Sequence, residues 1–509
     1  MRERNVDERS VAENGGGASA RPMLASERTG FVARHDLWTD AQYAAAGQMR
    51  RVMDEIGIEM VRFSFVDQHG ILRSKTIARA GVAAALRSGV TAPSSLLLKD
   101  TSGQSVFSVF AEDTGVGVEG FSGAGDIVMV PDPQTFRVLP WAERTAWILC
   151  DLRFPDGSPV PFCTRTMLRT ELATLASRGY GMTVGAELEF HVYRLDENVL
   201  EAAHVGVPGH PGDALVVGPT TRGSQLLQEE ALDAMQPLVN ALYTGLTLLD
   251  LPLRSIELEF GPSQFEITME AGDAASIADA IVLCRMAVRR IARGLGYHAT
   301  FMSRPQAAEG ASTGWHLHQS LRDISTGDPV FAPDDQTAPL SDLGVAYLAG
   351  LLAHAPAAAA FATPTVNGYK RYQPFSLAPD RIAWGIDNKG AMVRAVGGQG
   401  DPATRLENRS GEPAANPYLY IVSQLISGMD GVDRGLVPPA PTTDPYRADA
   451  PHLPASLGEA VDALVGDEAF RQALGNAVVD WYATVKRAEF GRYLRHVSDW
   501  EQREYFEIF

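Results

Sequence analysis

The chain has 509 residues, with 62 acidic against 44 basic side chains and a formal net charge of -18. This length is enough for more than one domain, and the excess of acid argues against a protein that binds nucleic acid through its phosphates. Three separated cysteines without a CxxC pair indicate a reducing compartment, and no apolar run reaches the ~20 residues of a membrane span. We therefore expect a cytoplasmic protein that binds neither nucleic acid nor membrane.

The N-terminal part of the chain has the pattern of a small β-rich domain. Residues 1–40 start with a polar, glycine-containing stretch and are predicted to be a disordered tail. A short amphipathic helix is expected over 41–56. Alternating apolar residues flank a turn at Asp67–Gly70 in "VRFSFVDQHGILRSKTIA", which predicts a β-hairpin. Further strands are predicted in "GDIVMVPDPQTFRVLPW" and "TAWILCDLRFPDG", so residues 41–150 form the first predicted domain.

Residues 151–509 are predicted to form one large α+β domain, because they contain no repeat and no internal linker. A helix in "TMLRTELATLASRG" ends at Gly179 and leads into the strand "VGAELEFHVY". The strands of "RSIELEFGPSQFEITME" precede a helix from about Asp273 to Leu295, and "HATFMSRP" and "GWHLHQSL" alternate like strands. Helices are predicted over 341–360 and in the last sixty residues.

Three predicted strands carry acids or histidines two residues apart, in apolar surroundings. Side chains at i and i+2 lie on the same face of a strand, and two adjacent buried carboxylates repel each other and lose hydration. A divalent cation would neutralise them, and carboxylates with imidazole suit Mg²⁺ or Mn²⁺, whereas a structural zinc site would favour cysteine. The residues are Glu187 and Glu189, then Glu257 and Glu259 followed by Glu266, then His316 and His318, with Glu407 in "TRLENRS".

Four arginines lie around that last glutamate: Arg371, Arg394, Arg405 and Arg409. Metal ions beside guanidinium groups provide what phosphoryl transfer needs, since the cations neutralise the transferring oxygens and bidentate guanidinium groups fix their geometry. Any one acidic pair could equally be a solvated strand face, and any one arginine a surface ion pair. The full set in order favours a phosphoryl-transfer site.

From about residue 55 to the C-terminus, the chain resembles the glutamine synthetase family, and the matching stretches occur in the family's order. The matching stretches include "VDQHG", "DIVMVPDPQTFRVLPW", "GAELEF", "EFGPSQFEI", "TGWHLHQS", "PTVNGYKR", "RLENR" and "AANPYL". The resemblance implies an N-terminal β-grasp domain and a catalytic domain built on a curved antiparallel sheet with surrounding helices. It also implies self-association into two stacked hexameric rings, a dodecamer, with active sites between neighbouring subunits.

The resemblance also implies roles for individual residues. Glu189, Glu259 and Glu266 correspond to ligands of a first metal ion, and Glu187, His316 and Glu407 to ligands of a second, with two to three Mg²⁺ or Mn²⁺ ions per site. Nucleotide binding falls to Glu187, His318, Ser320, Lys389, Arg394 and Arg405. Substrate binding falls to Glu189, Gly314, His316, Arg371 and Arg409, and the catalytic arginines are Arg371, Arg394 and Arg409. The family activates the γ-carboxylate of glutamate with ATP, and an amine then attacks the γ-glutamyl phosphate.

The departures from the family pattern concern the amine. A flap glutamate and an aspartate of the neighbouring subunit's β-grasp domain help to bind ammonium in the family, and here Leu377 and Ala92 stand at those positions. Ammonium needs nearby negative charge and a base, so the loss of both acids disfavours it. The milder departures are Gly368 for serine, Lys389 for arginine, Leu258 for histidine, and Ala311-Ser312 for an Asn-Gly pair.

We therefore expect an ATP-dependent γ-glutamyl–amine ligase for a bulky, weakly basic amine such as aniline, with Ala92 and Leu377 beside the amine. It resembles the branch of the family that opens amine catabolism by glutamylation. Three alternatives stay open at this point. They are a ligase for alkylamines or polyamines with acids supplied elsewhere, such as Asp100 or Asp380; a ligase that uses another acid; and a non-catalytic structural relative.

Overall fold

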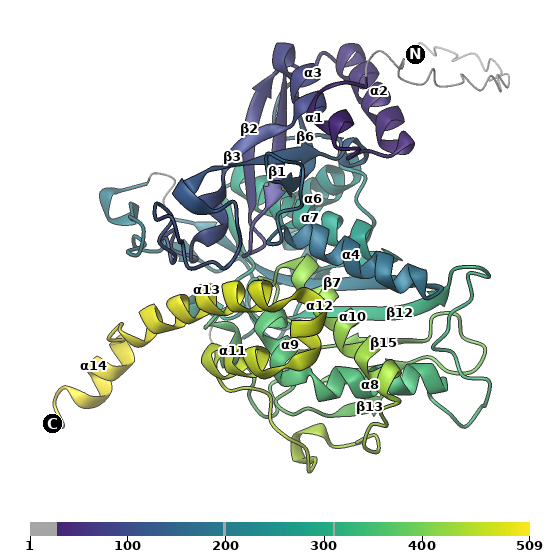
Figure 1. Cartoon of the computed structure of the whole chain (residues 1–509). Coiled ribbons are helices and arrows are strands. Elements are labelled where there is room, and N and C mark those ends of the chain that lie inside the picture. Colours follow the sequence, from purple (N-terminus) through teal and green to yellow (C-terminus); the bar gives the residue numbers. More distant parts are fainter. Residues whose placement is uncertain (1–27, 197–199, 309–310) are drawn as a thin grey trace, which may run out of the picture.

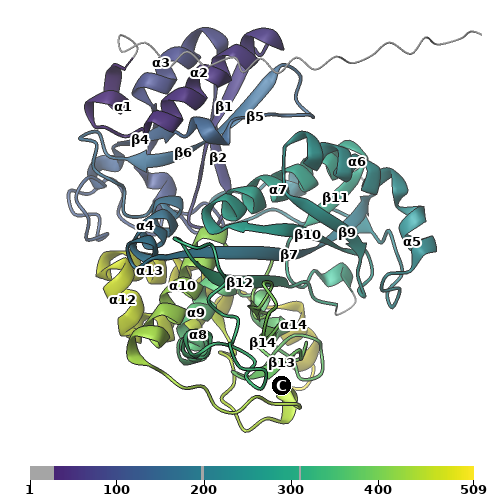
Figure 2. The same ribbon diagram turned by 90° about the vertical axis from the view of Figure 1, so that its right-hand side faces the viewer.

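The computed structural model describes residues 28–196, 200–308 and 311–509, which form two sheets with their helices (Figure 1). The N-terminal sheet has the order β2-β1-β6-β4-β3, with β5 paired to β6, and its β1 and β6 run parallel. Its strands are β1 (Met60–Val66), β2 (Leu72–Ala78), β3 (Val90–Pro93), β4 (Asp126–Pro131), β5 (Arg137–Val138) and β6 (Thr145–Arg153). Helices α1 (Gly30–Arg34), α2 (Asp40–Glu55) and α3 (Arg79–Ser88) lie on its outer side (Figure 2).

Most N-terminal predictions are confirmed, and one is wrong in part. Strands β1 and β2 pair antiparallel across the predicted turn, and α2 matches the predicted helix. The predicted tail of residues 1–40 is wrong for its last part, because α1 begins at Gly30 and both Phe31 and Trp38 are buried. Residues 1–27 lie outside the described residues.

The larger sheet has the order β13-β14-β15-β12-β7-β10-β9, with β8 and β11 paired to β7. Only antiparallel pairs occur among the described strands of this sheet except for β13 and β14, and the 16-residue strand β7 lies in the middle. Its strands are β7 (Tyr180–Leu195), β8 (Val217–Gly218), β9 (Leu253–Leu258), β10 (Gln264–Asp273), β11 (Tyr297–Thr300), β12 (Trp315–Asp323), β13 (Trp384–Ile386), β14 (Val393–Val396) and β15 (Arg405–Asn408).

Helices pack around both ends of this sheet. In Figure 2, α6 and α7 lie beside β9 and β10, and α8, α9 and α10 lie beside β12 and β14. The helices are α4 (Thr164–Ser177), α5 (Glu229–Ala234), α6 (Gln236–Leu248), α7 (Ala274–Gly294), α8 (Asp342–Ala353), α9 (Ala355–Ala362), α10 (Pro417–Arg434), α11 (Leu457–Gly466), α12 (Glu468–Leu474), α13 (Asn476–Leu494) and α14 (Asp499–Tyr505). Apolar side chains such as Leu188 and Phe190 of β7 are fully buried, so the alternate residues of this strand are left for the opposite face.

The predicted helix over 341–360 is two helices, α8 and α9, bent by 75°. His354 stands at the bend, and its ring nitrogens lie 2.7 Å from a carboxylate oxygen of Asp430 and 2.7 Å from one of Asp467. Pro356 in the first turn of α9 cannot continue the hydrogen bonding of α8. Within the described residues, no single helix is long and apolar enough to cross a membrane; only this bent pair passes on length and composition together.

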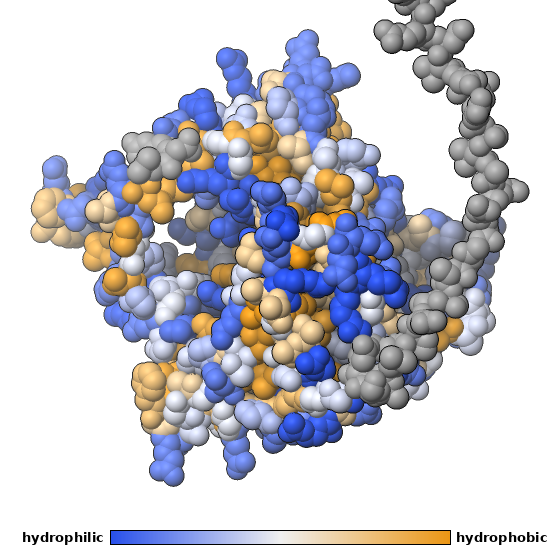
Figure 3. Space-filling model, turned by 90° about the horizontal axis from the view of Figure 1, so that it is seen from above, coloured by the Kyte–Doolittle hydropathy of each residue, from blue (hydrophilic) through white to orange (hydrophobic). Residues whose placement is uncertain are grey.

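The C-terminal helices form an arm that extends away from the body of the molecule (Figure 1). Helix α14 buries none of its residues. We define the C-terminal arm by its exposed apolar side chains, which are Tyr493, Leu494, Val497, Trp500, Tyr505, Phe506, Ile508 and Phe509. By contrast, the face seen from above the N-terminal domain mixes hydrophilic and hydrophobic side chains (Figure 3).

Candidate active site

Strand register builds the site, because the residues that the sequence singles out stand directly opposite one another in the sheet. Glu187 of β7 faces His316 of β12, and Glu189 faces Glu266 of β10. On the other side of β10, Glu257 of β9 faces Glu266. Cross-strand partners have their side chains on the same face at about 4.5–5.5 Å between Cβ atoms. The central strands therefore bring these acids together with one histidine.

The same register adds the second half of the site on the other side of β12. His318 is opposite Glu407 of β15, and Glu407 is opposite Arg394 of β14. Arg405 and Arg409 stand two residues before and after Glu407 and so share its face. Imidazole, carboxylate and guanidinium groups from β12, β15 and β14 thus extend the line of glutamates that β7, β9 and β10 form.

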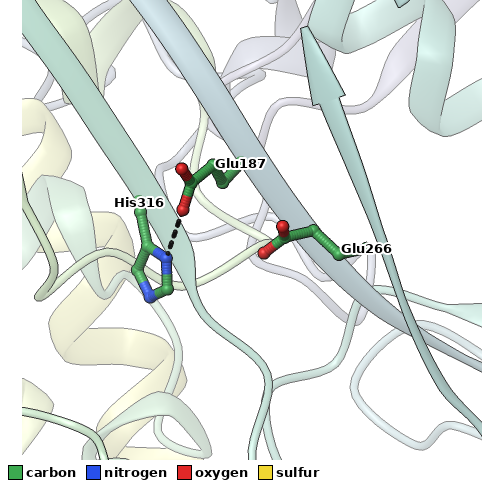
Figure 4. Close-up of side chains that lie close together, drawn as sticks. All are labelled: Glu187, Glu266 and His316. Atoms are coloured by element: carbon green, nitrogen blue, oxygen red, sulfur yellow. Dashed lines mark hydrogen bonds and ion pairs between the residues drawn. The ribbon is translucent and has the colours of Figure 1, made fainter. Parts of the chain in front are cut away.

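Two histidines bind the central glutamate. His316 Nδ1 lies 3.0 Å from Glu187 Oε2, and His318 Nε2 lies 2.9 Å from Glu187 Oε1; Figure 4 shows the first pair with Glu266 nearby. Burial alone would raise the pKa of Glu187, but these two hydrogen bonds hold that pKa far below its ordinary value. Glu187 is therefore charged throughout the range in which an enzyme works.

The neighbouring glutamates have weaker contacts with histidine, since His316 Nε2 lies 3.7 Å from Glu189 Oε1. Burial, reinforced by the charges of Glu189 and Glu187, raises the pKa of Glu266 to about 10. Burial and the charge of Glu259 raise the pKa of Glu189 to about 7, although the backbone N–H of Gly314 and the Gln264 amide each donate to it at 2.8 Å. The raised pKa values show that the nearby cationic side chains do not fully compensate these carboxylates, and bound divalent cations would add the missing positive charge.

Two groups of side chains place their ligand atoms within 4.8 Å of one another. The first is Glu187, Glu266 and His316, and the second is Glu187, His318 and Glu407. Carboxylate oxygens with imidazole are a donor set suited to Mg²⁺ or Mn²⁺, so these residues fit divalent cations. Glu189 and Glu259 are in neither of these two groups, and the predicted ligand sets, Glu189, Glu259 and Glu266 for one ion and Glu187, His316 and Glu407 for another, stay a prediction.

Arg371 is held by the backbone next to Arg409. Its Nη1 donates to the carbonyl of Ser410 and its Nη2 to the carbonyl of Arg409, both at 2.8 Å. Gly314 leaves room for this guanidinium, because a Cβ at Gly314 would lie 2.6 Å from Arg371 Nη2. Glycine is thus needed here for space.

The other three arginines contact Glu407 or His318. Arg409 and Arg394 both form ion pairs with Glu407, and the Arg394 pair measures 3.0 Å. Arg405 donates from Nε to His318 Nδ1 at 3.0 Å. Glu407 is fully buried, and although burial opposes it, the pKa of this carboxyl is lowered by its cationic neighbours.

A cavity of about 1590 Å³ lies over this face of the sheet. Most predicted site residues line it: Glu187, Glu189, Glu259, Glu266, Gly314, His316, His318, Ser320, Arg371, Leu377, Lys389, Arg405 and Arg409. Carboxylates at one part of the floor and guanidinium groups at another can bind divalent cations together with a phosphorylated substrate.

The cavity does not include every predicted residue. Ala92 lies in β3 of the N-terminal sheet, is 3% exposed, and is not among the lining residues. The suggested replacement acids are also elsewhere: Asp100 is paired with Arg492 at 3.2 Å, and Asp380 is buried beside His452 at 3.8 Å. Of the two residues predicted to lie beside the amine, Leu377 lines the cavity of this chain and Ala92 does not.

The structure adds lining residues that sequence reasoning missed. Gln264 is buried and its amide bridges Glu189 to the carbonyl of Ser312. Strand periodicity could have predicted Gln264 as a site residue, because it stands two residues before Glu266 and shares its strand face. Phe260 and Phe375 line the cavity from loops, where no periodicity marks them.

Comparison with known proteins identifies the family. The model of the glutamine synthetase catalytic domain matches residues 161–505. The chain is 42% identical over 500 residues to γ-glutamylanilide synthase of an Acinetobacter species, covering 95% of this chain and 100% of that protein. It is 33% identical over 387 residues to γ-glutamylethanolamide synthetase GlnA4 of Streptomyces coelicolor, covering 76% and 80%. A solved GmaS/ADP complex has a TM-score of 0.74 at 27% identity, covering 90% of this chain and 99% of that one. The chain therefore belongs to the glutamine synthetase family and is an ATP-dependent carbon–nitrogen ligase.

Proposed function

We propose that this ligase joins the γ-carboxylate of glutamate to a bulky, weakly basic amine of the aniline type. The observation that carries the proposal is the apolar pair Phe375 and Leu377 at the cavity, with Leu377 at the position where the family has an acid for ammonium. The full-length likeness to a γ-glutamylanilide synthase supports the same class of amine.

In the proposed reaction the γ-carboxylate attacks the γ-phosphorus of ATP and releases ADP. The amine nitrogen then attacks the acyl carbon, the acyl–oxygen bond to phosphate breaks, and the nitrogen loses a proton. Arg371 and Arg409 would hold glutamate and the transferring phosphoryl group. Arg394, Arg405, Lys389, His318 and Ser320 would bind the nucleotide. Two to three Mg²⁺ or Mn²⁺ ions, held by Glu187, Glu189, Glu259, Glu266, His316 and Glu407, would neutralise charge on the phosphoryl oxygens.

The loop that carries Phe375 and Leu377 presents both side chains to solvent at the cavity. Each is 66% exposed, and each has a left-handed backbone, with φ of 58° and 64°. Such a conformation costs a non-glycine residue about 1–3 kcal/mol, so surrounding contacts must hold it. The ring of Phe375 packs 5.0 Å from Tyr446 with the Arg447 guanidinium 5.7 Å from its centre, and Tyr446 donates to the carbonyl of Ala378 at 3.1 Å.

An arylamine suits the apolar surface of Phe375 and Leu377 for two reasons. It is neutral at pH 7, so it needs no carboxylate anchor, and its ring gains about 25 cal/mol per Å² of apolar surface that it buries. Ammonium, alkylamines and polyamines arrive as cations, and Leu377 offers no negative charge to bind them. The likeness to an ethanolamide synthetase favours small alkylamines as the second candidate.

A panel of amines tests the proposal by phosphate release with Mg-ATP and glutamate. We expect aniline to give a kcat/KM at least tenfold above those of ammonium, putrescine and ethanolamine. Replacing Leu377 by glutamate should raise kcat/KM for ammonium and lower it for aniline, while Leu377→Gln, of equal size without charge, should lower only the value for aniline. Leu377 is the better single site to change, because Ala92→Asp would bury a carboxylate. Preferred turnover of putrescine or ammonium by the wild-type enzyme would overturn the arylamine proposal.

We also propose that the chain self-associates into stacked rings, as a dodecamer, through contacts that include the C-terminal arm. Eight exposed apolar side chains at the end of α13, in α14 and in the residues around α14 are unfavourable in water and suit burial against another copy. Removing residues 495–509 should leave the fold intact, since α14 buries no residue, and should lower the assembly mass measured by light scattering. The control is removal of residues 1–27, which lie outside the described residues, and an unchanged mass after the C-terminal truncation would contradict the proposal.

A further inference from the structure

Glu412 is a buried carboxylate to which none of the roles above is assigned. It is fully inaccessible to solvent, and burial raises its pKa to about 7 in spite of hydrogen bonds from Thr365. Glu412 lies three residues after Arg409, at the end of the segment 409–412. It faces the segment 363–372, which we call the strap and which carries Arg371.

The strap is fastened to the segment 409–412 at both of its ends. Near its start, the backbone N–H of Thr365 donates to Glu412 Oε1 at 2.7 Å, and its hydroxyl donates to Oε2 at 2.9 Å. Near its end, Arg371 donates to the carbonyls of Ser410 and Arg409. The hydroxyls of Thr363 and Tyr372 also donate to the carbonyl of Ser410, at 3.0 Å and 2.9 Å. Arg371 is only 3% exposed, and together these contacts set its place over the cavity floor.

Gly368 gives the Glu412 carboxylate its space. A Cβ at Gly368 would lie 2.4 Å from Glu412 Oε2 and 2.5 Å from Thr363 Cγ2. The Gly368 N–H also donates to the Thr365 hydroxyl at 3.1 Å, which orients that hydroxyl toward Glu412. In this chain the carboxylate and the Thr363 methyl group fill the volume that a side chain at position 368 would need.

We propose that Glu412 is a positioning residue for Arg371 and thereby sets the affinity for the acid substrate, with Gly368 as its steric counterpart. Loss of the carboxylate leaves the Thr365 N–H without its partner and loosens the strap around Thr365, while the bond from Thr363 to Ser410 remains. The guanidinium of Arg371 then shifts relative to Arg409, and binding of the acid weakens more than binding of nucleotide or amine. The inference rests on the proposed role of Arg371 and is independent of which amine is used.

Steady-state kinetics of Glu412→Ala and Glu412→Gln, with melting temperatures, tests this. We expect Glu412→Ala to raise KM for glutamate about tenfold or more, with KM for Mg-ATP and for the amine changed less than about threefold. Glu412→Gln should show a smaller rise, because its amide oxygen still accepts from Thr365. The matched control is Asp467→Asn, another hydrogen-bonded carboxyl, whose side chain is 13% exposed; it should lower the melting temperature and leave all three KM values unchanged.

A variant cycle isolates the steric partner. In a Thr363→Ser background, which removes the second clash, Gly368→Ala should raise KM for glutamate as Glu412→Ala does and add nothing when Glu412→Ala is already present. Additive effects, or an equal rise of all three KM values with the loss of stability, would overturn the proposal. If the wild-type enzyme uses an acid other than glutamate, the proposed acid is wrong, and the same variants compared on that acid still decide the role of Glu412.

Discussion

Replacing Glu266 by glutamine should abolish metal-dependent phosphate release and at the same time make the metal-free protein more stable. The pKa of Glu266 in the folded chain is about 10, against an ordinary value of 4.5. A raised carboxyl pKa means that the folded state binds the proton more tightly than the unfolded state, so stability falls as the pH rises from 4.5 toward 10. Glutamine has no such group, and we expect a gain on the order of 1–3 kcal/mol at pH 8 that vanishes below pH 4.5.

Phosphate release should fall at least about 100-fold in this variant, because one of the carboxylates that fit a divalent cation is lost. Melting curves with and without Mg²⁺ measure the effect on stability. The wild-type melting temperature should rise with Mg²⁺, and that of Glu266→Gln should rise less. Glu171→Gln on α4 is the control, since burial also raises the pKa of Glu171 but the residue lies outside the cavity lining. A Glu266→Gln protein that keeps Mg²⁺-dependent activity, or that is less stable without metal, would contradict the metal-site interpretation.

The acids and histidines of the site could be predicted from sequence because strand periodicity is local. Glu187 and Glu189 must share a face wherever β7 lies, and the same holds for His316 and His318. Which strands are neighbours is not local. Glu407 is 89 residues beyond His318 in the chain, and only the pairing of β12 with β15 places them opposite each other. The two candidate cation groups depend on this register, which strand periodicity alone does not give, and the predicted division of the ligands between two metal ions stays a prediction.

The predictions that were wrong involve elements too short to be stable alone. Helix α1 has five residues, and its buried Phe31 and Val32 pack within a polar stretch whose composition suggested a tail. A helix of that length forms only through tertiary contacts, which sequence periodicity does not report. Phe375 at the cavity was missed for a similar reason, since its position depends on a loop conformation and on Tyr446, 71 residues away.

Replacing Arg165 by methionine should strongly destabilise the folded protein. Arg165 is 7% exposed and donates to three aspartates, at 2.8 Å to Asp132, 3.0 Å to Asp151 and 2.8 Å to Asp279. Asp132 and Asp151 belong to the N-terminal sheet region and Asp279 to α7, so this guanidinium joins the two parts of the molecule. Breaking a buried ion network by removing one partner leaves uncompensated charge and costs about 3–5 kcal/mol.

The pH dependence should change sign, which separates this mechanism from a loss of packing. Burial would raise the pKa of Asp132, but Arg165 holds it below its ordinary value of 3.8, so in the wild-type protein this group adds stability above pH 3.8 that is lost on acidification. Without Arg165, burial should raise the pKa of Asp132, and Arg165→Met should therefore gain stability as the pH falls from 7 to 5. Arg178→Met, which removes an exposed pair with Asp433, should cost less than about 1 kcal/mol and leave the pH slope unchanged. Urea titrations of the three proteins at pH 5 and pH 7 measure both effects, and a parallel pH slope for Arg165→Met and wild type would show that the network contributes packing and not charge compensation.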